Sequence, residues 1–245
     1  KHASTYGVAK KLPSCAGFLV QKEVDTFNKI LKEPKRPFVA VLGGAKIGDK
    51  IDVVQNLLKK VDTILIGGGM CFTFLKAIKG EVGSSLVDDE KIDFCYNVIK
   101  QALNQKVKII LPIDFVCANS IDDEKSADVY KLGKIPEDKM GLDIGPKTVK
   151  LFNKFLKRAK TIVWNGPMGV YEKEMFKNGT LSVAKLIAKN KRAISVVGGG
   201  DVVSAVEEYG LEEYFTHIST GGGASLKLLE GKELPAVKAL DEPIE

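Results

Sequence analysis

The sequence predicts an α/β fold, a Rossmann-like parallel sheet with helices on both faces, and three observations support it. Short apolar runs rich in β-branched residues alternate with helical patterns along the 245 residues. The runs are apolar throughout, as in strands that are covered on both faces. Glycines follow most of them. Strand alternating with helix at this spacing indicates right-handed βαβ crossovers.

The first predicted element is an amphipathic helix within 16–33, where Val24, Phe27 and Leu31 recur at helical spacing before Pro34. The polar stretch 119–139 has little periodicity and is interpreted as an excursion containing a short hairpin or helix. Buried strands are expected at 38–42, 63–66, 107–111, 161–164, 193–197 and 216–219. Helices are expected between them at 50–60, 89–104, 148–157, 180–189 and 202–209.

Composition places the chain among soluble globular proteins. With 44% hydrophobic residues it can bury a sizeable core. No apolar run approaches the ~18 residues of a membrane span, and the basic start is not followed by a signal-peptide core. The four cysteines lack metal-binding spacing, which predicts buried, reduced structural thiols and a cytoplasmic protein. The lack of a long apolar run predicts no membrane partner. Because the first residue is Lys1, we expect the natural N-terminus to be missing.

Charge gives a second set of expectations. The net charge is +6, but the 37 basic residues are spread along the chain among 31 acidic ones. Such a distribution is typical of a solvated surface and predicts no nucleic-acid partner. The only arginines are Arg36, Arg158 and Arg192. The chain is therefore poorly equipped to clamp a small anionic acceptor with guanidinium groups.

Five glycine clusters follow the apolar runs and predict a nucleotide site. Glycine brings bare backbone close to a ligand, and the helix that follows offers free N–H groups to phosphate. A single cluster could equally be a tight strand-to-helix turn. Neither G-x-G-x-x-G nor G-x-x-x-x-G-K-[ST] occurs, which disfavours a dinucleotide-binding oxidoreductase and a P-loop ATPase. The clusters are at 43–44, 67–69, 165–169, 198–200 and 221–223.

Several polar residues beside these glycines could carry chemistry. Lys46 and Lys50 are expected at i, i+4 on the first turns of one helix, facing phosphates, although a solvated basic face is the alternative. Asp201 could be a plain helix N-cap or a Mg²⁺ ligand. Glu172 could accept ribose hydroxyls or be a surface acid. His217, in a strand-like run, is expected to be a core residue.

Five motifs, in order over nearly the whole chain, together resemble phosphoglycerate kinase, specifically its C-terminal nucleotide-binding lobe. The resemblance implies a remnant of the N-terminal lobe at 1–15, an interdomain helix at 16–33, a nucleotide-binding domain at 34–233 and a returning tail at 234–245. The motifs are VLGGAKIGDK at 41–50, IGGGMCFTFL at 66–75, MGLDIGP at 140–146, VWNGPMGV at 163–170 and STGGGAS at 219–225.

The resemblance also implies roles for individual residues. The family transfers a phosphoryl group reversibly between ADP and 1,3-bisphosphoglycerate in glycolysis, with Mg²⁺ as cofactor and ADP or ATP as substrate. Lys46, Gly200, Gly222 and Gly223 would be the catalytic residues, and Asp201 would bind the metal. The nucleotide would contact Lys46, Lys50, Gly68, Gly69, Gly141, Leu142, Asn165, Glu172, Gly199, Gly200, Asp201 and Val202.

Two departures from the family pattern qualify these implications. The cluster that binds phosphoglycerate belongs to the N-terminal lobe, so this chain, expected to be a monomer, would be inactive alone. Val202 stands where the family usually has Thr or Ser, so a hydroxyl beside the phosphates is missing. The alternative is a stand-alone nucleotide-binding module without catalysis.

Overall fold

A computed structural model of the chain describes residues 1–240, and a parallel sheet forms its centre. The strand order is β3-β2-β1-β7-β8-β9, and every neighbouring pair is parallel. The predicted fold class is confirmed. The bounds are β1 Phe38–Leu42, β2 Thr63–Ile66, β3 Lys108–Ile110, β7 Thr161–Asn165, β8 Ile194–Gly198 and β9 His217–Ile218.

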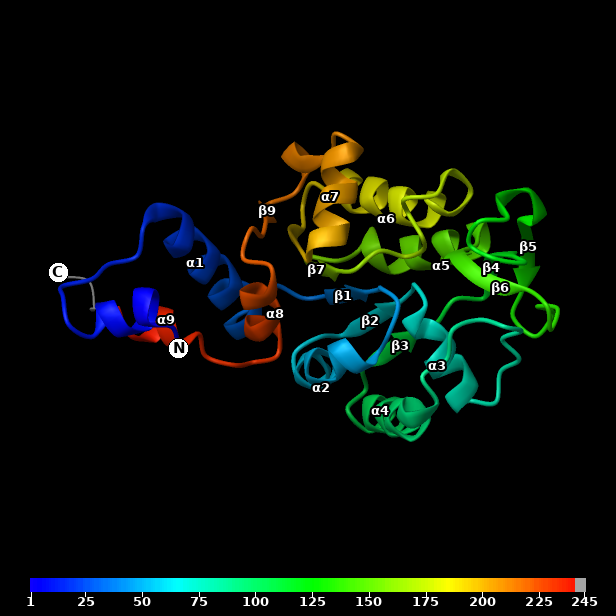
Figure 1. The fold of residues 1–245 in the computed structure, drawn as a ribbon, viewed down its shortest axis with the longest axis horizontal. Helices are drawn as coiled ribbons and strands as arrows, with labels where there is room; N and C mark the ends of the chain where they lie inside the picture. The colour runs from blue at the N-terminus through cyan, green and yellow to red at the C-terminus, as the bar shows by residue number, and fades with distance from the viewer. Residues whose placement is uncertain (241–245) are drawn as a thin grey trace.

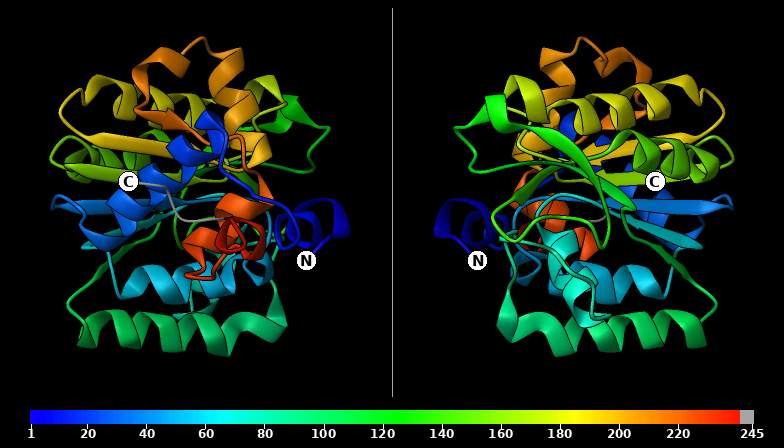
Figure 2. Two further views of the ribbon diagram at one scale, coloured as in Figure 1. Left: turned by 90° about the vertical axis from the view of Figure 1, so that its left-hand side faces the viewer. Right: turned by 90° about the vertical axis from the view of Figure 1, so that its right-hand side faces the viewer.

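Helices cover both faces of this sheet, as the two panels of Figure 2 show with the strands running across the view. Alternate residues of β1 pack into opposite cores: Ala40 with Val53 of α2 on one side, and Val41 with Val183 of α6 on the other. One layer contains α2 Ile51–Leu58, α3 Met70–Ala77 and α4 Ile92–Asn104, and the other contains α5 Pro146–Leu156, α6 Asn178–Lys189 and α7 Gly200–Glu208.

A second, antiparallel sheet was not predicted. Its order is β5-β4-β6, with β4 Asp114–Ala118, β5 Asp128–Lys131 and β6 Met140–Ile144. The stretch interpreted as an excursion thus contributes β5 and a short 3₁₀ turn, η4 Glu124–Ser126. Asp114 ties this sheet to the main body, because its carboxylate accepts hydrogen bonds from the backbone of Lys147 and Thr148 in the first turn of α5.

The two ends of the described chain lie together, apart from the sheet, on the left of Figure 1. There η1 Ala3–Gly7 contacts α9 Pro235–Lys238, next to α1 Phe18–Lys32, and α8 Gly223–Leu229 leads back from the sheet. The 234–245 segment expected to be a tail falls partly outside the described residues. No helix of residues 1–240 combines the length and apolarity needed to cross a bilayer.

Glu23 of α1 joins this end to the sheet. Its carboxylate accepts hydrogen bonds from the backbone of Thr220 and the hydroxyl of Ser219, and it lies 3.1 Å from His217 Nε2. Burial raises the pKa of Glu23, but its contacts with His217, Thr220 and Ser219 outweigh burial and leave the pKa below its ordinary value. His217 is buried, as predicted.

The cysteine expectation holds for three of the four residues. Cys71, Cys95 and Cys117 are buried, and burial raises the pKa of Cys95 and of Cys117 to about 12. Such thiols are unreactive at neutral pH. Cys15 is exposed instead, because it precedes α1 in a segment that lies away from both cores.

Candidate functional site

A cavity of about 240 Å³ opens at the carboxyl ends of β7 and β8, where ligands bind in open α/β sheets. It is lined by glycine-rich turns, one lysine and one aspartate. The structure brings together eight of the predicted site residues here: Lys50, Asn165, Gly199, Gly200, Asp201, Val202, Gly222 and Gly223.

The turn from β8 into α7 forms the floor of the cavity. Gly199 has φ +103°, a conformation that L side chains rarely adopt, and a Cβ there would lie 2.9 Å from Asn165 Nδ2. Asn165 is held in turn by donating to Gly198 O at 2.7 Å. The helical hydrogen bonds start with Val203 N donating to Gly199 O. The N–H groups of Gly200 and Asp201 precede that bond and are free to meet an anion.

Lys50 supplies the positive charge of the cavity. Its side chain is half-buried, and its ammonium group lies 3.7 Å from where a Cβ of Gly44 would be. Burial lowers the pKa of Lys50, while the fields of Asp49 and Asp201 oppose the shift. Within residues 1–240 it forms no ion pair. A partly desolvated ammonium without a partner gains most from an incoming anion.

Three of the glycines that line the cavity are not explained by packing. A Cβ added at Gly200, Gly222 or Gly223 would meet no protein atom within 4 Å. Of these three positions, position 222 alone has a backbone conformation that favours glycine, with φ +48°. At Gly200 and Gly223 neither packing nor conformation demands glycine, which points to space reserved for a ligand.

Four other residues predicted to contact the nucleotide, Gly68, Gly69, Gly141 and Leu142, lie outside this cavity, and packing explains why three of them are glycines. A Cβ at Gly68 would lie 2.6 Å from Gly44 N, one at Gly69 would lie 2.7 Å from Ala45 O, and one at Gly141 would strike the ring of Phe72. Leu142 follows in β6 and is buried. Close packing therefore explains all three glycines, with Gly68 and Gly69 against the loop at 44–45 and Gly141 of β6 against Phe72 of α3.

Three local predictions need correction or stay open. Lys46 and Lys50 do not share a helix face, because Gly48–Lys50 form a 3₁₀ turn and α2 begins at Ile51; Lys46 is exposed outside the cavity. Asp201 is not the N-cap, since Gly199 occupies that position and makes no side-chain cap. Glu172 is exposed and does not line the cavity.

The sequence reasoning missed two residues that line the cavity and one buried aspartate outside its lining. Gly166 and Leu226 line the cavity, and only the glycine stood in a recognised motif. Asp143 is buried in β6 and accepts hydrogen bonds from Gly179 N at 2.6 Å and Ile144 N at 2.8 Å. Burial raises the pKa of Asp143 well above its ordinary value. A lone aspartate within an apolar strand gave no signal that it joins β6 to α6.

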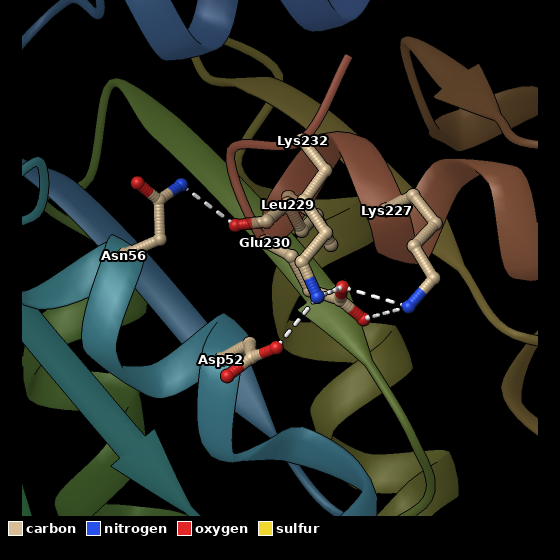
Figure 3. A network of polar contacts seen from close by, with 6 residues as sticks. All are labelled: Asp52, Asn56, Lys227, Leu229, Glu230 and Lys232. Carbon is tan, nitrogen blue, oxygen red and sulfur yellow. Dashed lines mark hydrogen bonds and ion pairs between the residues drawn. The ribbon is translucent and has the colours of Figure 1, made fainter. Parts of the chain in front are cut away.

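The network in Figure 3 joins α8, which lines the cavity, to α2, the helix that follows Lys50. Lys232 Nζ lies 2.6 Å from Asp52 Oδ2 and 2.7 Å from Glu230 Oε2, and its hydrogen bonds lower the pKa of both carboxyls. Asn56 Nδ2 donates to Leu229 O at 2.8 Å. These contacts hold the end of α8 against α2, so the elements carrying Gly223 and Lys50 keep a fixed separation.

The metal chemistry of the site depends on one carboxylate. Within residues 1–240 no group of three or more His, Cys, Asp or Glu residues could hold a metal by itself. Asp201 lines the cavity beside the free N–H groups of α7. Mg²⁺ commonly takes one or two carboxylates together with substrate phosphates, so this donor set fits Mg²⁺ only in company with a phosphate ligand.

Comparison with known proteins identifies the family. The family model described as phosphoglycerate kinase matches residues 1–232. The chain belongs to the phosphoglycerate kinase family. It is 54% identical to the phosphoglycerate kinase of Pseudothermotoga lettingae and 49% identical to that of Dictyoglomus turgidum, over 98% of this chain in both comparisons. The solved structure of phosphoglycerate kinase from Coxiella burnetii superposes with a TM-score of 0.93 at 40% identity over 97% of this chain.

The relatives are longer than this chain. It spans 60% of the Pseudothermotoga lettingae protein, 61% of the Dictyoglomus turgidum protein and 61% of the Coxiella burnetii chain. The matched portion of each relative therefore includes the sheet and the cavity described above, and about two fifths of each relative has no counterpart here.

Proposed function

We propose that this chain is the nucleotide-binding half of a phosphoglycerate kinase, which moves a phosphoryl group reversibly between ADP and 1,3-bisphosphoglycerate in glycolysis. The observation that carries the proposal is the half-buried, unpaired Lys50 opposite the free N–H groups of α7. The open space at Gly200 and Gly223 supports it further. Such a cavity suits the phosphates of ADP or ATP better than an uncharged ligand.

The residues present fit a bound Mg²⁺-nucleotide. Asp201 would hold the metal together with phosphate oxygens, and the metal would neutralise charge that develops during transfer. Lys50 would bind the phosphates, and Gly200, Gly222 and Gly223 would leave room for the group in transit. Phosphoryl transfer needs little covalent chemistry from the protein, so positioning and charge supply most of the stabilisation.

Lys46 is proposed as the lysine that approaches the transferred group. Its exposed side chain, outside the cavity, is free to reach an acceptor delivered from another lobe. The acceptor would be 3-phosphoglycerate, bound by the N-terminal lobe and brought in line with the nucleotide by closure about α1. We further propose that the protein is a cytoplasmic monomer.

Calorimetric titration tests the binding half of this proposal. The chain should bind MgADP and show no measurable binding of 3-phosphoglycerate. Replacing Asp201 by Asn should reduce the Mg²⁺ dependence of nucleotide binding while leaving the fold intact. Tight binding of 3-phosphoglycerate by this chain alone would contradict the division of labour between two lobes.

Reconstitution tests the catalytic half and separates it from the alternative, a binding module without catalysis. An N-terminal lobe of the same family, fused before Lys1 or added in trans, should restore ATP-dependent phosphorylation of 3-phosphoglycerate. Lys46→Ala should then lower kcat far more than nucleotide affinity, because its charge would act on the transition state. A fusion that binds both substrates yet stays inactive, even with Val202→Thr, would favour the binding module.

A further inference from the structure

The fold gathers positive charge at the edge of the main sheet where the strands begin, opposite the cavity. We call this surface the basic edge. It consists of the segments 33–37, 59–62, 105–108, 157–160 and 189–193, which lead into β1, β2, β3, β7 and β8. Its acids are Glu33 and Asp62. Its cations are Lys35, Arg36, Lys59, Lys60, Lys106, Lys108, Lys157, Arg158, Lys160, Lys189, Lys191 and Arg192.

These cations are spread along the sequence but adjacent in space, because each lies just before or at the start of a strand of one parallel sheet. Five neighbouring strands at about 4.8 Å spacing make the row roughly 19 Å long. The row ends at β8, since the loop before β9 carries Glu212 and Glu213. All three arginines of the chain belong to it. The basic residues are evenly spread along the sequence, which predicted a merely solvated surface, but folding gathers twelve of them at one end of the sheet.

Charge pairing and helix ends account for only part of the row. Of the twelve cations, Arg36 alone forms an ion pair within residues 1–240, with Asp62 at 2.6 Å. Lysines in the last turn of a helix stabilise its dipole, which explains Lys189 of α6. It does not explain Lys108, which is exposed within β3. Nor does it explain Lys106, which has φ +59°, where glycine or asparagine is usual.

A groove of about 630 Å³ lies within the basic edge and gives it depth. Exposed cations surround a half-buried aromatic ring, that of Phe155. Asp62 is the one acid among the lining residues, and it is already paired with Arg36. The cations that line the groove are Arg36, Lys106, Lys108, Lys154 and Arg158.

We propose that the basic edge binds a linear chain of phosphates, such as the backbone of a single-stranded nucleic acid or inorganic polyphosphate. A row of cations, of which Arg36 alone forms an ion pair within residues 1–240, matches a row of phosphates, and displaced counterions drive such binding. Among the exposed large hydrophobic residues of the described chain, Leu103 and Tyr214 lie beside this edge, Tyr214 in the acidic loop before β9, so a cluster of apolar residues that could anchor a protein partner is lacking. A flat anionic membrane could not reach into the groove.

The basic edge and the cavity lie at opposite ends of the same strands. Lys50 lines the cavity, near the carboxyl ends of the strands, and Lys108 lines the groove, near their amino ends. A phosphate chain on the basic edge should therefore bind without displacing a nucleotide from the cavity. Binding of phosphates at the basic edge does not depend on the proposed kinase function.

Fluorescence anisotropy with the whole chain tests the proposal, using a labelled single-stranded RNA 20-mer and, separately, inorganic polyphosphate as competitor. The double variant Lys108→Glu/Arg158→Glu should lose affinity by about tenfold or more at low salt, because two contacts become repulsive. Its matched control is Lys125→Glu/Lys134→Glu, which makes the same change of charge on exposed residues near β5. The control should keep most of the affinity, and circular dichroism should show both variants folded.

The two probes distinguish the source of the phosphates. Binding of both supports recognition of phosphate alone, whereas binding of RNA alone would add stacking on Phe155 as a source of affinity. Equal losses in both double variants would overturn the proposal, since binding would then follow net charge. It would also be overturned if neither probe bound, if ADP displaced them, or if only vesicles of anionic phospholipid bound.

Discussion

Gly68 and Gly200 look alike in the sequence, each within a glycine triplet after a buried strand, but the structure uses them differently. A Cβ at Gly68 would lie 2.6 Å from both Gly44 N and Gly44 O, so the neighbouring loop already fills its space. A Cβ at Gly200 would meet nothing within 4 Å. The first glycine is explained by packing of the protein on itself, and the second by room left for something else.

The sharpest way to break this comparison is to add a methyl group at the packed position. Gly68→Ala should lower the free energy of unfolding by about 3 kcal/mol or more, from backbone collision together with φ +62°. Denaturant unfolding followed by circular dichroism measures it. Near-native stability would show that the loops at Gly44 and Gly68 can separate freely, and the contrast would collapse.

A variant of Lys50 tests whether the positive charge of the cavity serves ligand binding or the stability of the fold. Lys50→Met should weaken MgADP binding by about 1–3 kcal/mol, since a charge-assisted contact to phosphate is lost. Stability should stay the same or rise, because burial already lowers the pKa of this ammonium group and so disfavours its charged form. Calorimetry and thermal unfolding give the two values. A large fall in stability with unchanged affinity would make Lys50 a structural residue.

Gly200→Ala completes the matched pair with Gly68→Ala. An alanine here should leave the free energy of unfolding unchanged or raise it by about 0.4–1 kcal/mol, because the unfolded chain loses freedom. Nucleotide affinity should fall by about 1 kcal/mol, because the methyl group enters space intended for phosphate. If affinity is unaffected while stability falls, the open space at Gly200 has no bearing on binding.

Much of the fold could be predicted because its signals are local. The runs that became β1 and β2 have the predicted bounds, since strands buried on both faces are apolar throughout. The second sheet was missed because β4 and β6 contain Asp114 and Asp143, which resemble loop residues. Both carboxylates accept hydrogen bonds from backbone N–H groups of distant segments, Asp114 from Thr148 and Asp143 from Gly179. Sequence patterns do not reveal such a role.

The site shows the same division between local and long-range information. Gly199, Gly200 and Asp201 meet at the cavity because one strand-to-helix turn holds all three. Lys46 was placed on a helix face because the 3₁₀ turn before α2 could not be foreseen from glycine and lysine spacing. The basic edge could not be predicted from the sequence, because its charges become neighbours only when the strands assemble into the sheet.

The smallest expected effect on binding comes from Val202, which lies at the boundary between the hydrophobic core and the cavity. Its side chain packs in the core with Val206 and Phe215, yet it also lines the cavity. A hydroxyl in Val202→Thr that faces the cavity should tighten nucleotide binding by about 0.5–1.5 kcal/mol. Stability should fall by about 1 kcal/mol, since a polar group enters a buried position.

The variant Val202→Ala is the control that separates the effect of the threonine hydroxyl from the effect of the space left by the valine side chain. Alanine also removes methyl groups from the core, but it offers no donor to phosphate. Calorimetry should therefore show tighter MgADP binding in the threonine variant only. If both variants gain equally, the extra room beside Gly200 causes the change; if neither gains, the backbone N–H groups of α7 already satisfy the phosphate, and the valine costs the site nothing.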